Sequence, residues 1–428
     1  MSVTRAVIES NGPSGEVPDD HYAFAGLPLV ERAVLTAAAA GLRDIVVAGV
    51  AVPDPAIRRR LSTRGIEVQW TPDAWTTAVP ETGAAVVWNV ATIVEPEVID
   101  RLRAEGARVG AAGSGAPCVV DFSSGEPVVL AVGRSALAGI AEGSVTAAAR
   151  TLARAGSLRP VDAGRGFARR VHSTRHAAEL ERAFIRRLNG SEYALTKVLR
   201  RQSVHLTRAL VRTPLGPNAI TVLSLLVSVA AAGFLGLPGY WTALLGAALY
   251  YLSTLLDCCD GEVARCTFRT SAFGCWLETF SDYVSTVLIL GAVLLRVVAE
   301  ARSELDVQAA GIAVWGTLIT IALLAYQRHR VAGHDPDAYE RIFKSRLGGA
   351  SSGLVGRAVV WSLQFIKRAC VAHVLLALAA FGQTRMLVYL WAFAVILAVP
   401  VSLGVHLALV GRPRTVSGGR VAKESMPS

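Results

Sequence analysis

The sequence predicts a chain of two parts, a soluble α/β domain followed by an α-helical integral membrane bundle. Hydrophobic residues make up 52% of the 428 residues and charged residues only 18%, a balance typical of membrane proteins. Long apolar segments are concentrated after residue 213, whereas the first 150 residues alternate between short apolar runs and helical patterns. The composition and the long apolar segments predict membrane-spanning helices, and the alternation in the first 150 residues predicts a separate soluble domain.

The first 150 residues carry the pattern of an α/β domain. Helical patterns cover 27–41 and 95–105, and each follows or precedes a β-type apolar run. The predicted strands lie at 6–8, 45–47 and 85–87. Because strands that alternate with helices join through crossover connections, we expect a mostly parallel sheet.

A basic segment connects the two parts. Residues 150–212 contain fifteen Arg or Lys against four acids, and this excess accounts for the net charge of +10. Residues 194–212 place apolar side chains along one helical stripe, with basic residues elsewhere. We interpret them as an amphipathic helix on the anionic cytoplasmic leaflet, with an ordinary linker helix as the alternative. We expect no nucleic-acid binding, because no aromatic interleaving or known module is present.

Apolar segments of nearly 20 residues predict about six transmembrane helices. The candidate spans are 219–237, 240–257, 276–298, 308–326, 366–383 and 386–410. Lys and Arg gather before the first span, in 327–365 and in the tail, so we expect a multi-pass cell-membrane protein with both termini cytoplasmic. The expected domains are a soluble domain at 1–150, a basic linker with a juxtamembrane helix at 151–212, the membrane domain at 213–410 and a disordered basic cytoplasmic tail at 411–428.

Four acids lie at the adjoining ends of the second and third spans. On a helix, Asp257 and Asp260 share one face with Ala264, and Glu278 and Asp282 share another. Ionised carboxylates near a bilayer need a compensating metal ion or polar cavity. Since hard divalent cations prefer oxygen ligands, the four acids predict a site for Mg²⁺ or Mn²⁺ on the cytoplasmic side.

Small and basic residues surround these acids. Gly261 and Gly274 allow a bulky ligand to approach the backbone, and Ala264 keeps the same face open. Arg265 offers a fork of donors suited to phosphate oxygens. The combination predicts phosphoryl transfer from a nucleotide-diphosphate donor. A divalent-cation transporter is the alternative, because acids within the membrane also line ion paths.

The spacing Asp-x2-Asp-Gly-x2-Ala-Arg-x8-Gly-x3-acid-x3-Asp over residues 257–282 resembles the signature of the CDP-alcohol phosphatidyltransferase family. Pro217-Asn218-Ala-Ile-Thr221 also resembles the segment that opens this family's first membrane helix, and the resemblance covers roughly residues 193–410. It implies a homodimeric membrane enzyme that moves a phospho-alcohol or phosphatidyl group from a CDP-alcohol to an acceptor hydroxyl and releases CMP. CDP-diacylglycerol and CDP-inositol are the expected donors, for phospholipid or inositol-phosphodiester synthesis.

The resemblance also implies a role for each residue of the signature. Asp257, Asp260 and Glu278 would hold two divalent metal ions. Asp282 would act as general base on the acceptor hydroxyl, or serve only as a further metal ligand. The CDP site would be lined by Gly261, Ala264, Arg265 and Gly274. The family normally has Asp where this chain has Glu278, and because metal geometry is sensitive to the extra methylene, an inactive membrane scaffold is an alternative.

Basic residues near later spans are candidates for binding an acceptor phosphate, such as that of inositol phosphate or glycerol phosphate. They are Arg328, Arg330, Lys367 and Arg368. Positive charge that flanks a membrane span on its cytoplasmic side explains them equally well.

The soluble domain carries a second resemblance. The segments 26–34 and 40–42 resemble the Rossmann-like sugar-phosphate nucleotidyltransferase fold, which occurs as an inositol-phosphate cytidylyltransferase fused to a CDP-alcohol phosphotransferase. No Lys or Arg lies between Glu9 and Arg32 to hold a triphosphate, and the segment 87–91, where a strand of that family ends in a metal-binding Asp, has none. We therefore expect a non-catalytic domain, with a bifunctional cytidylyltransferase/phosphotransferase as the alternative.

Overall fold

The structure is a computed structural model in which the chain forms two compact units. The first unit contains Met1–Gly190, Arg200–Pro217 and Cys258–Ala272, and the second contains Ser191–Leu199, Asn218–Asp257 and Phe273–Ser428. The residues that the structure describes are 3–10, 19–50, 52–81, 83–111, 118–121, 129–137, 143–162, 166–188, 194–300, 303–332 and 368–410.

The first unit is an α/β domain. Its strands are β1 (Val3–Glu9), β2 (Ala23–Phe24), β3 (Leu27–Pro28), β4 (Asp44–Ala48), β5 (Gln69–Thr71), β6 (Ala84–Asn89), β7 (Thr92–Val94), β8 (Cys118–Asp121), β9 (Val129–Val132), β10 (Arg159–Asp162) and β11 (Ala168–Arg170). Its helices are α1 (Leu29–Ala39), α2 (Pro55–Thr63), α3 (Trp75–Ala78), α4 (Pro96–Ala111), the 3₁₀ helix η1 (Arg134–Leu137), α5 (Val145–Arg154), α6 (Thr174–Arg187) and most of α7 (Ala194–Leu210).

Over the described residues, the main sheet of this unit has seven strands in the order β10-β8-β9-β6-β1-β4-β5. Strands β1, β4, β5 and β6 run parallel, with Ala6 opposite Ile45 and Val86, and β9 is antiparallel to its neighbours. The predicted strands and the mostly parallel sheet are thus confirmed. The edge strand β10 comes from the segment that we expected to be a basic linker.

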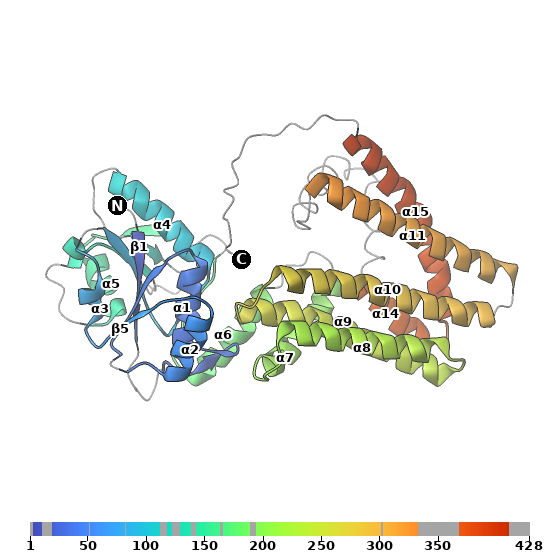
Figure 1. Ribbon diagram of the computed structural model, residues 1–428, viewed down its shortest axis with the longest axis horizontal. Helices are drawn as coiled ribbons and strands as arrows, with labels where there is room; N and C mark the ends of the chain where they lie inside the picture. Colours follow the sequence, from blue (N-terminus) through green and yellow to red (C-terminus); the bar gives the residue numbers. More distant parts are fainter. Residues whose placement is uncertain are drawn as a thin grey trace. The chain divides into compact units, whose positions relative to one another are not determined.

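Helices cover both faces of this sheet (Figure 1). On one face, Val7 and Val87 belong to a buried cluster that includes Trp75 of α3 and Val145 of α5. Helices α1 and α4 contact the same strands from the other face. The nearly continuous apolar runs of the central strands follow from this arrangement, because a parallel sheet between two helical layers is buried on both sides.

The second unit is helical. Its helices are α8 (Pro217–Gly236), α9 (Tyr240–Cys266), α10 (Ala272–Ala299), α11 (Glu304–Ala332), α14 (Arg368–Ala380) and α15 (Arg385–Val410), and the last turns of α9 belong to the first unit. Among the described residues, four helices are long and apolar enough to cross a membrane, namely α8, α9, α10 and the stretch Glu304–Leu323 of α11. Helices α14 and α15 coincide with the last two of the six expected spans but offer only shorter apolar stretches, Arg368–Ala380 and Arg385–Leu397.

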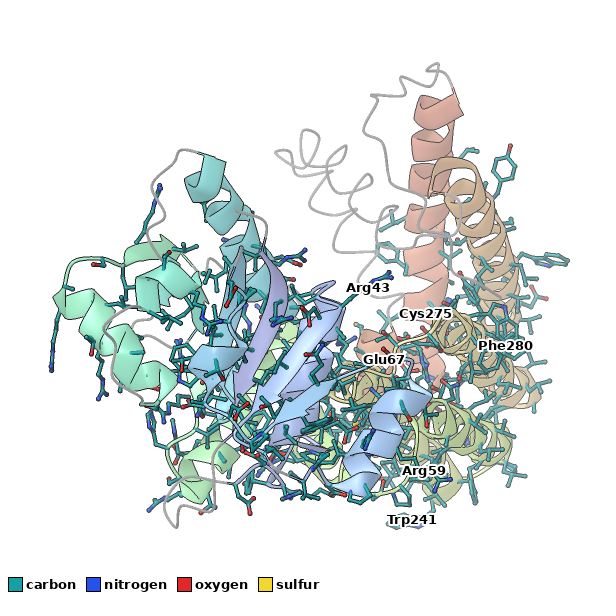
Figure 2. The ribbon with its side chains drawn as sticks, turned by 60° about the vertical axis from the view of Figure 1, so that its left-hand side comes forward. Arg43, Arg59, Glu67, Trp241, Cys275 and Phe280 are labelled. Carbon is teal, nitrogen blue, oxygen red and sulfur yellow. The ribbon has the colours of Figure 1, made fainter. Side chains whose placement is uncertain are left out.

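Small residues let these helices approach closely. A Cβ added to Gly246 of α9 would lie 2.7 Å from Leu235 of α8, and one added to Gly316 of α11 would overlap the side chain of Val395 of α15. Such contacts are typical of membrane helices, which associate by close packing rather than by a hydrophobic effect between them. Large side chains point outward instead: Trp241 is 77% exposed (Figure 2), as expected of a surface that faces lipid.

Helix α7 is confirmed within the segment where we predicted an amphipathic helix, but it buries a different set of residues. Leu199 and Leu210 are buried as expected, whereas Leu195 and Val198 of the predicted apolar stripe are 38% and 40% exposed. The buried face also includes the polar residues Ser203 and Thr207, each with no exposed surface. This face therefore packs on protein and must satisfy hydroxyl groups there.

Candidate active site

The signature residues are placed by two consecutive helices joined by a short connection. Helix α9 carries Asp257 and Asp260 near its C-terminal end, and α10 carries Glu278 and Asp282 in its first turns. The whole stretch from Asp257 to Arg265 is helical, so the predicted helical spacing of the acids holds.

Asp257 and Asp282 converge on the guanidinium group of Arg368, the first residue of α14. Nη1 of Arg368 donates to Oδ1 of Asp257 at 2.8 Å and also to Oδ1 of Asp282. The Arg368 and Asp257 side chains are 10% and 15% exposed, whereas Asp282 is 44% exposed. The structure thus brings two of the four predicted acids together around one positive charge, and leaves Asp282 as the member that a substrate can reach.

Serine hydroxyls support this ion cluster from α8 and α9. Nη2 of Arg368 lies 3.3 Å from Oγ of Ser253, which donates to the carbonyl oxygen of Ser224 at 2.9 Å and lies 2.6 Å from Oγ of Ser228. All three serines are buried, so these bonds satisfy their hydroxyl groups within the apolar bundle. The network fixes the side of α9 from which Asp257 projects.

The remaining signature residues of α9 belong to the first compact unit. Asp260 is 3% exposed, and its Oδ1 accepts from the backbone N–H of Gly261 at 2.5 Å. A Cβ added to Gly261 would lie 3.3 Å from Nη1 of Arg265. The space that this glycine provides is therefore used by the Arg265 side chain, one turn further along the helix.

Glu262, an unspecified position of the signature, has a structural role that our sequence analysis missed. Its carboxylate is buried and accepts from Oγ of Ser203 and from Oγ1 of Thr207, both at 2.5 Å. Ser203 and Thr207 are four residues apart and therefore share one face of α7. The sequence did contain a signal for this contact, namely an acid within an apolar helix and a Ser-x3-Thr pair on a preceding helix that could donate to it.

The residue types of the signature fit a hard cation. Within the described ranges, no three His, Cys, Asp or Glu side chains are gathered closely enough to hold a metal ion. The positive group between Asp257 and Asp282 is instead Arg368, and both carboxylates reach the same nitrogen atom. All four predicted ligands are carboxylates, the groups that Mg²⁺ and Mn²⁺ prefer, and two of them already share one cationic partner.

Of the four basic residues considered for an acceptor phosphate, the structure describes the side chain of Arg368 alone. Its contacts with two signature acids make it part of the acidic cluster rather than a flanking charge. The side chains of Arg328 and Arg330, and the whole of Lys367, lie outside the described residues.

In the α/β domain, the carboxyl ends of β1 and β6 are the expected place for a nucleotide. There, Oε2 of Glu9 accepts from Nδ2 of Asn89 at 2.9 Å and from the backbone N–H of Val145 at 3.1 Å. Burial raises the pKa of Glu9, and these hydrogen bonds and Arg170 oppose the rise. The side chains at this edge bond to one another and to the backbone. The glycine-containing turn 12–16 lies outside the described residues.

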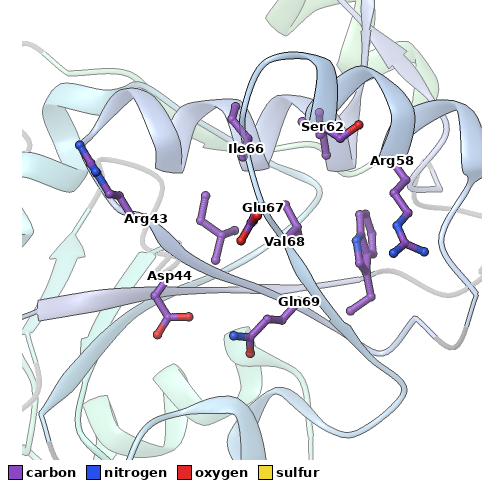
Figure 3. Close-up of a pocket in the computed structure, with 11 residues that line it drawn as sticks. Arg43, Asp44, Arg58, Ser62, Ile66, Glu67, Val68 and Gln69 are labelled. Carbon is purple, nitrogen blue, oxygen red and sulfur yellow. The ribbon is translucent and has the colours of Figure 1, made fainter. Parts of the chain in front are cut away.

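A cavity of about 410 Å³ lies elsewhere on this domain (Figure 3). It is lined by residues at the amino ends of two parallel strands, including Arg43 just before β4, Asp44 at the start of β4 and Gln69 at the start of β5. Because Glu9 and Asn89 mark the carboxyl ends of their strands, this cavity is at the opposite edge of the sheet from the expected nucleotide position.

Comparison with known proteins agrees with the signature. Residues 215–349 match the family model of CDP-alcohol phosphatidyltransferase. A protein of Aquifex aeolicus named bifunctional IPC transferase and DIPP synthase is 36% identical over 80 residues, which are 19% of this chain and 18% of the relative. A protein of the same name from Archaeoglobus fulgidus is 30% identical over 107 residues, 25% of this chain and 21% of the relative.

The chain thus spans about a fifth of the length of the curated relatives that it matches. Among solved structures, the inositol-1-phosphate CTP transferase from T. maritima is similar to 45% of this chain over 99% of its own, with 11% identity and a TM-score of 0.30.

Proposed function

We propose, from the premise that residues 215–349 form a CDP-alcohol phosphatidyltransferase domain, that this chain transfers a phospho-alcohol or phosphatidyl group from a CDP-alcohol to an acceptor hydroxyl and releases CMP. The observation that carries the proposal is the meeting of Asp257 and Asp282, from two helices, at one cationic group. CDP-diacylglycerol or CDP-inositol is the proposed donor, and a phospholipid or an inositol phosphodiester is the product.

In this proposal, Asp257, Asp260 and Glu278 hold two divalent ions, Mg²⁺ or Mn²⁺, and Asp282 can contribute a further oxygen. Such ions, when bound, offset the charge of the donor diphosphate. Arg265 is suited to a phosphate of the CDP group, because its guanidinium carries several donors and is exposed to solvent. Gly261, Ala264 and Gly274 line the same donor site.

The chemical step assigned to Asp282 is proton removal from the acceptor. Its carboxylate takes the proton of the acceptor hydroxyl, and the hydroxyl oxygen forms a bond to the β-phosphorus of the donor. The bond between that phosphorus and the bridging oxygen breaks, and CMP leaves with the oxygen. The 44% exposure of the Asp282 side chain supports this role, because the base must meet an incoming substrate.

We further propose a multi-pass homodimer in the cell membrane, with the signature and both termini on the cytoplasmic side. The distribution of Lys and Arg supports the orientation, since the connection that follows α9 carries Arg269 and the segment before α8 is strongly basic. A cytoplasmic site also receives its nucleotide-linked donor and releases CMP on the side where nucleotides are found.

For the α/β domain we propose a role without its own nucleotidyl transfer, because Glu9 and Asn89 bond to each other where a triphosphate and its metal would need free ligands. A bifunctional enzyme is the second candidate, and it is favoured by the names of the two relatives. Pyrophosphate release from CTP and inositol phosphate by the full chain would decide for the second candidate.

The transferase is tested by metal-dependent CMP release from the detergent-purified full chain, with each donor and a panel of polyol-phosphate acceptors. We expect Asp282→Asn to lower turnover at least about 1000-fold while CDP binding persists, because the substitution removes the base and keeps the size of the side chain. Asp306→Asn is the matched control. Asp306 is likewise an acid of the second unit, but it is buried and accepts from Tyr389 rather than from an arginine.

Unchanged turnover in Asp282→Asn would refute the role of Asp282 as base. Metal flux into proteoliposomes without CMP release would favour the transporter. A chain that neither binds CDP nor releases CMP would be the inactive membrane scaffold, the alternative raised by Glu278 in place of the family's Asp.

A further inference from the structure

The C-terminal end of α9 directly follows Arg265 of the signature and has an unusual backbone. The N–H of Arg269 donates to the carbonyl oxygen of Ala264 at 2.9 Å, across a residue, Phe268, whose φ is +53°. Helices commonly end with a residue in this left-handed conformation, but that residue is usually glycine. A Phe there is strained, so the surrounding structure must hold it in place.

Arg32 of α1 binds this helix end. Its Nη2 donates to the carbonyl oxygen of Cys266 at 2.6 Å, and the same group donates to the carbonyl oxygens of Phe24 and Ala25 at 3.0 and 3.1 Å. The guanidinium carbon also lies 5.8 Å from the centre of the Phe268 ring. Arg32 is only 3% exposed, and although burial lowers its pKa to about 10, it remains protonated at neutral pH.

A second arginine of the α/β domain reaches the next carbonyl group. Both terminal nitrogens of Arg64 lie 3.4 Å from the carbonyl oxygen of Thr267. The last carbonyl groups of a helix have no partners within the helix, and they carry its negative dipole end. Two guanidinium groups therefore supply both the missing donors and the complementary charge at the end of the signature helix.

The α/β domain also holds this helix through α7. Helix α7 binds Glu262 of α9 through Ser203 and Thr207, as described above. The carboxylate of Glu181 accepts from the N–H of Ala25 and from Arg208 of α7, both at 3.0 Å. Ala25, in the turn between β2 and β3, therefore accepts from Arg32 and donates to Glu181, the residue that binds α7.

We propose that the α/β domain clamps the end of the signature helix, and that Arg32 is a positioning residue for Asp260, Gly261, Ala264 and Arg265. These four residues lie within seven positions of Cys266 and belong to the same compact unit as Arg32. The effect that we expect Arg32 to have on activity rests on the proposed transferase function. It gives a role to an α/β domain in which the described side chains of Glu9 and Asn89, at the carboxyl ends of β1 and β6, bond to each other.

The test replaces Arg32 with Met in the full chain and measures two quantities. The first is the rate at which a maleimide labels the buried thiol of Cys266, with the exposed Cys275 as internal reference. The second is CMP release, separated into kcat and KM for the donor. Arg103→Met is the matched control, because Arg103 also donates to a backbone carbonyl of the domain, that of Ala40, and has no bond to α9.

We expect Arg32→Met to raise Cys266 labelling about tenfold and to raise KM for the donor about tenfold, with Arg103→Met unchanged in both. Arg32→Lys should lie between Arg32→Met and the wild type, since it keeps the charge but not the fork of donors. If Arg32→Met does not fold, Arg64→Met decides, because this half-buried side chain leaves the domain core intact and should still raise labelling about threefold.

Unchanged Cys266 labelling in the arginine variants would overturn the clamp. Faster labelling with an unchanged KM would overturn the positioning role. If the wild type releases no CMP at all, the transferase has failed, and the labelling rates still decide whether the helix end is clamped.

Discussion

The two candidate sites of this protein, the edge of the α/β sheet and the acidic cluster of the helical unit, satisfy their acids in different ways. In the α/β domain, the carboxylate of Glu9 is satisfied by neutral donors, the Asn89 amide and a backbone N–H. In the helical unit, Asp257 and Asp282 are satisfied by the charge of Arg368. Burial raises the pKa of Glu9, and its neutral donors satisfy the carboxylate without a cation. Two acids that share one charge instead create a place that a metal or phosphate-bound ion can occupy. The difference favours the helical unit as the place of the proposed phosphotransfer.

The comparison is tested most severely by Arg368→Met. Without the guanidinium, Asp257 and Asp282 lose their shared positive partner, and an acid near the membrane without a partner is costly. We expect CMP release to fall at least about 100-fold. We also expect added Mg²⁺ to raise Tm more in the variant than in the wild type, because the ion then supplies the only compensating charge.

Arg296→Met is the matched control for this experiment. Arg296 is a buried arginine of the same unit that donates to the carbonyl oxygens of Leu235 and Leu237 at the end of α8, and it pairs at 3.4 Å with one exposed acid, Glu300, rather than with two acids from different helices. This control should lose stability and keep the Mg²⁺ response of the wild type. An equal Mg²⁺ response in all three proteins would show that the two acids are not a cation site.

A prediction of smaller effect concerns Gly261. A Cβ at this position approaches Nη1 of Arg265 to 3.3 Å, so Gly261→Ala must displace the Arg265 side chain by a few tenths of an ångström. We expect CDP binding to weaken about tenfold, measured by titration of the full chain. Gly291→Ala in α10 is the control, because nothing lies within 4 Å of its added Cβ and alanine favours a helix. Equal CDP affinity in the two variants would separate Arg265 from the donor site.

The parts that the sequence predicted well are those with a local signal. The apolar runs of β1, β4 and β6, the long apolar helices and the helical spacing of the signature acids all depend on neighbouring residues. Contacts between distant positions carried no such signal. Arg368 is 111 residues from Asp257, and Arg32 is 234 residues from Cys266, so periodicity alone indicates neither pair.

Two residues, Arg368 and Glu262, carried only part of a local signal. Arg368 was predicted as a candidate ligand of an acceptor phosphate because it lies at the start of an apolar segment, and the structure places it against the acids of α9 and α10. The buried Glu262 went unnoticed because the signature leaves its position unspecified. A charged residue inside an otherwise apolar helix requires a partner, and that rule, applied to Glu262 first, points to the hydroxyl pair of α7.

The smallest expected effect belongs to Glu9, and it tests the other side of the comparison. The pKa of Glu9 in the folded protein is raised above its ordinary value of 4.5, so the folded state binds this proton more tightly than the unfolded state does. The stability contributed by protonated Glu9 is therefore complete below about pH 4.5 and is lost as the pH rises through the folded-state pKa. Glu9→Gln keeps an acceptor for Asn89 and Val145 and removes the titration.

We expect Glu9→Gln to match the wild type near pH 4 and to become more stable by about 1 kcal/mol or less toward pH 8. Amide hydrogen exchange in β1 and β6 of the full chain measures this difference locally, and Glu67→Gln, at an exposed position, is the control. CMP release should not change. A loss of stability at pH 8 in Glu9→Gln would mean that Arg170 and the hydrogen bonds stabilise the ionised carboxylate by more than burial destabilises it, and the α/β domain would then have to be reconsidered as a second ion-binding site.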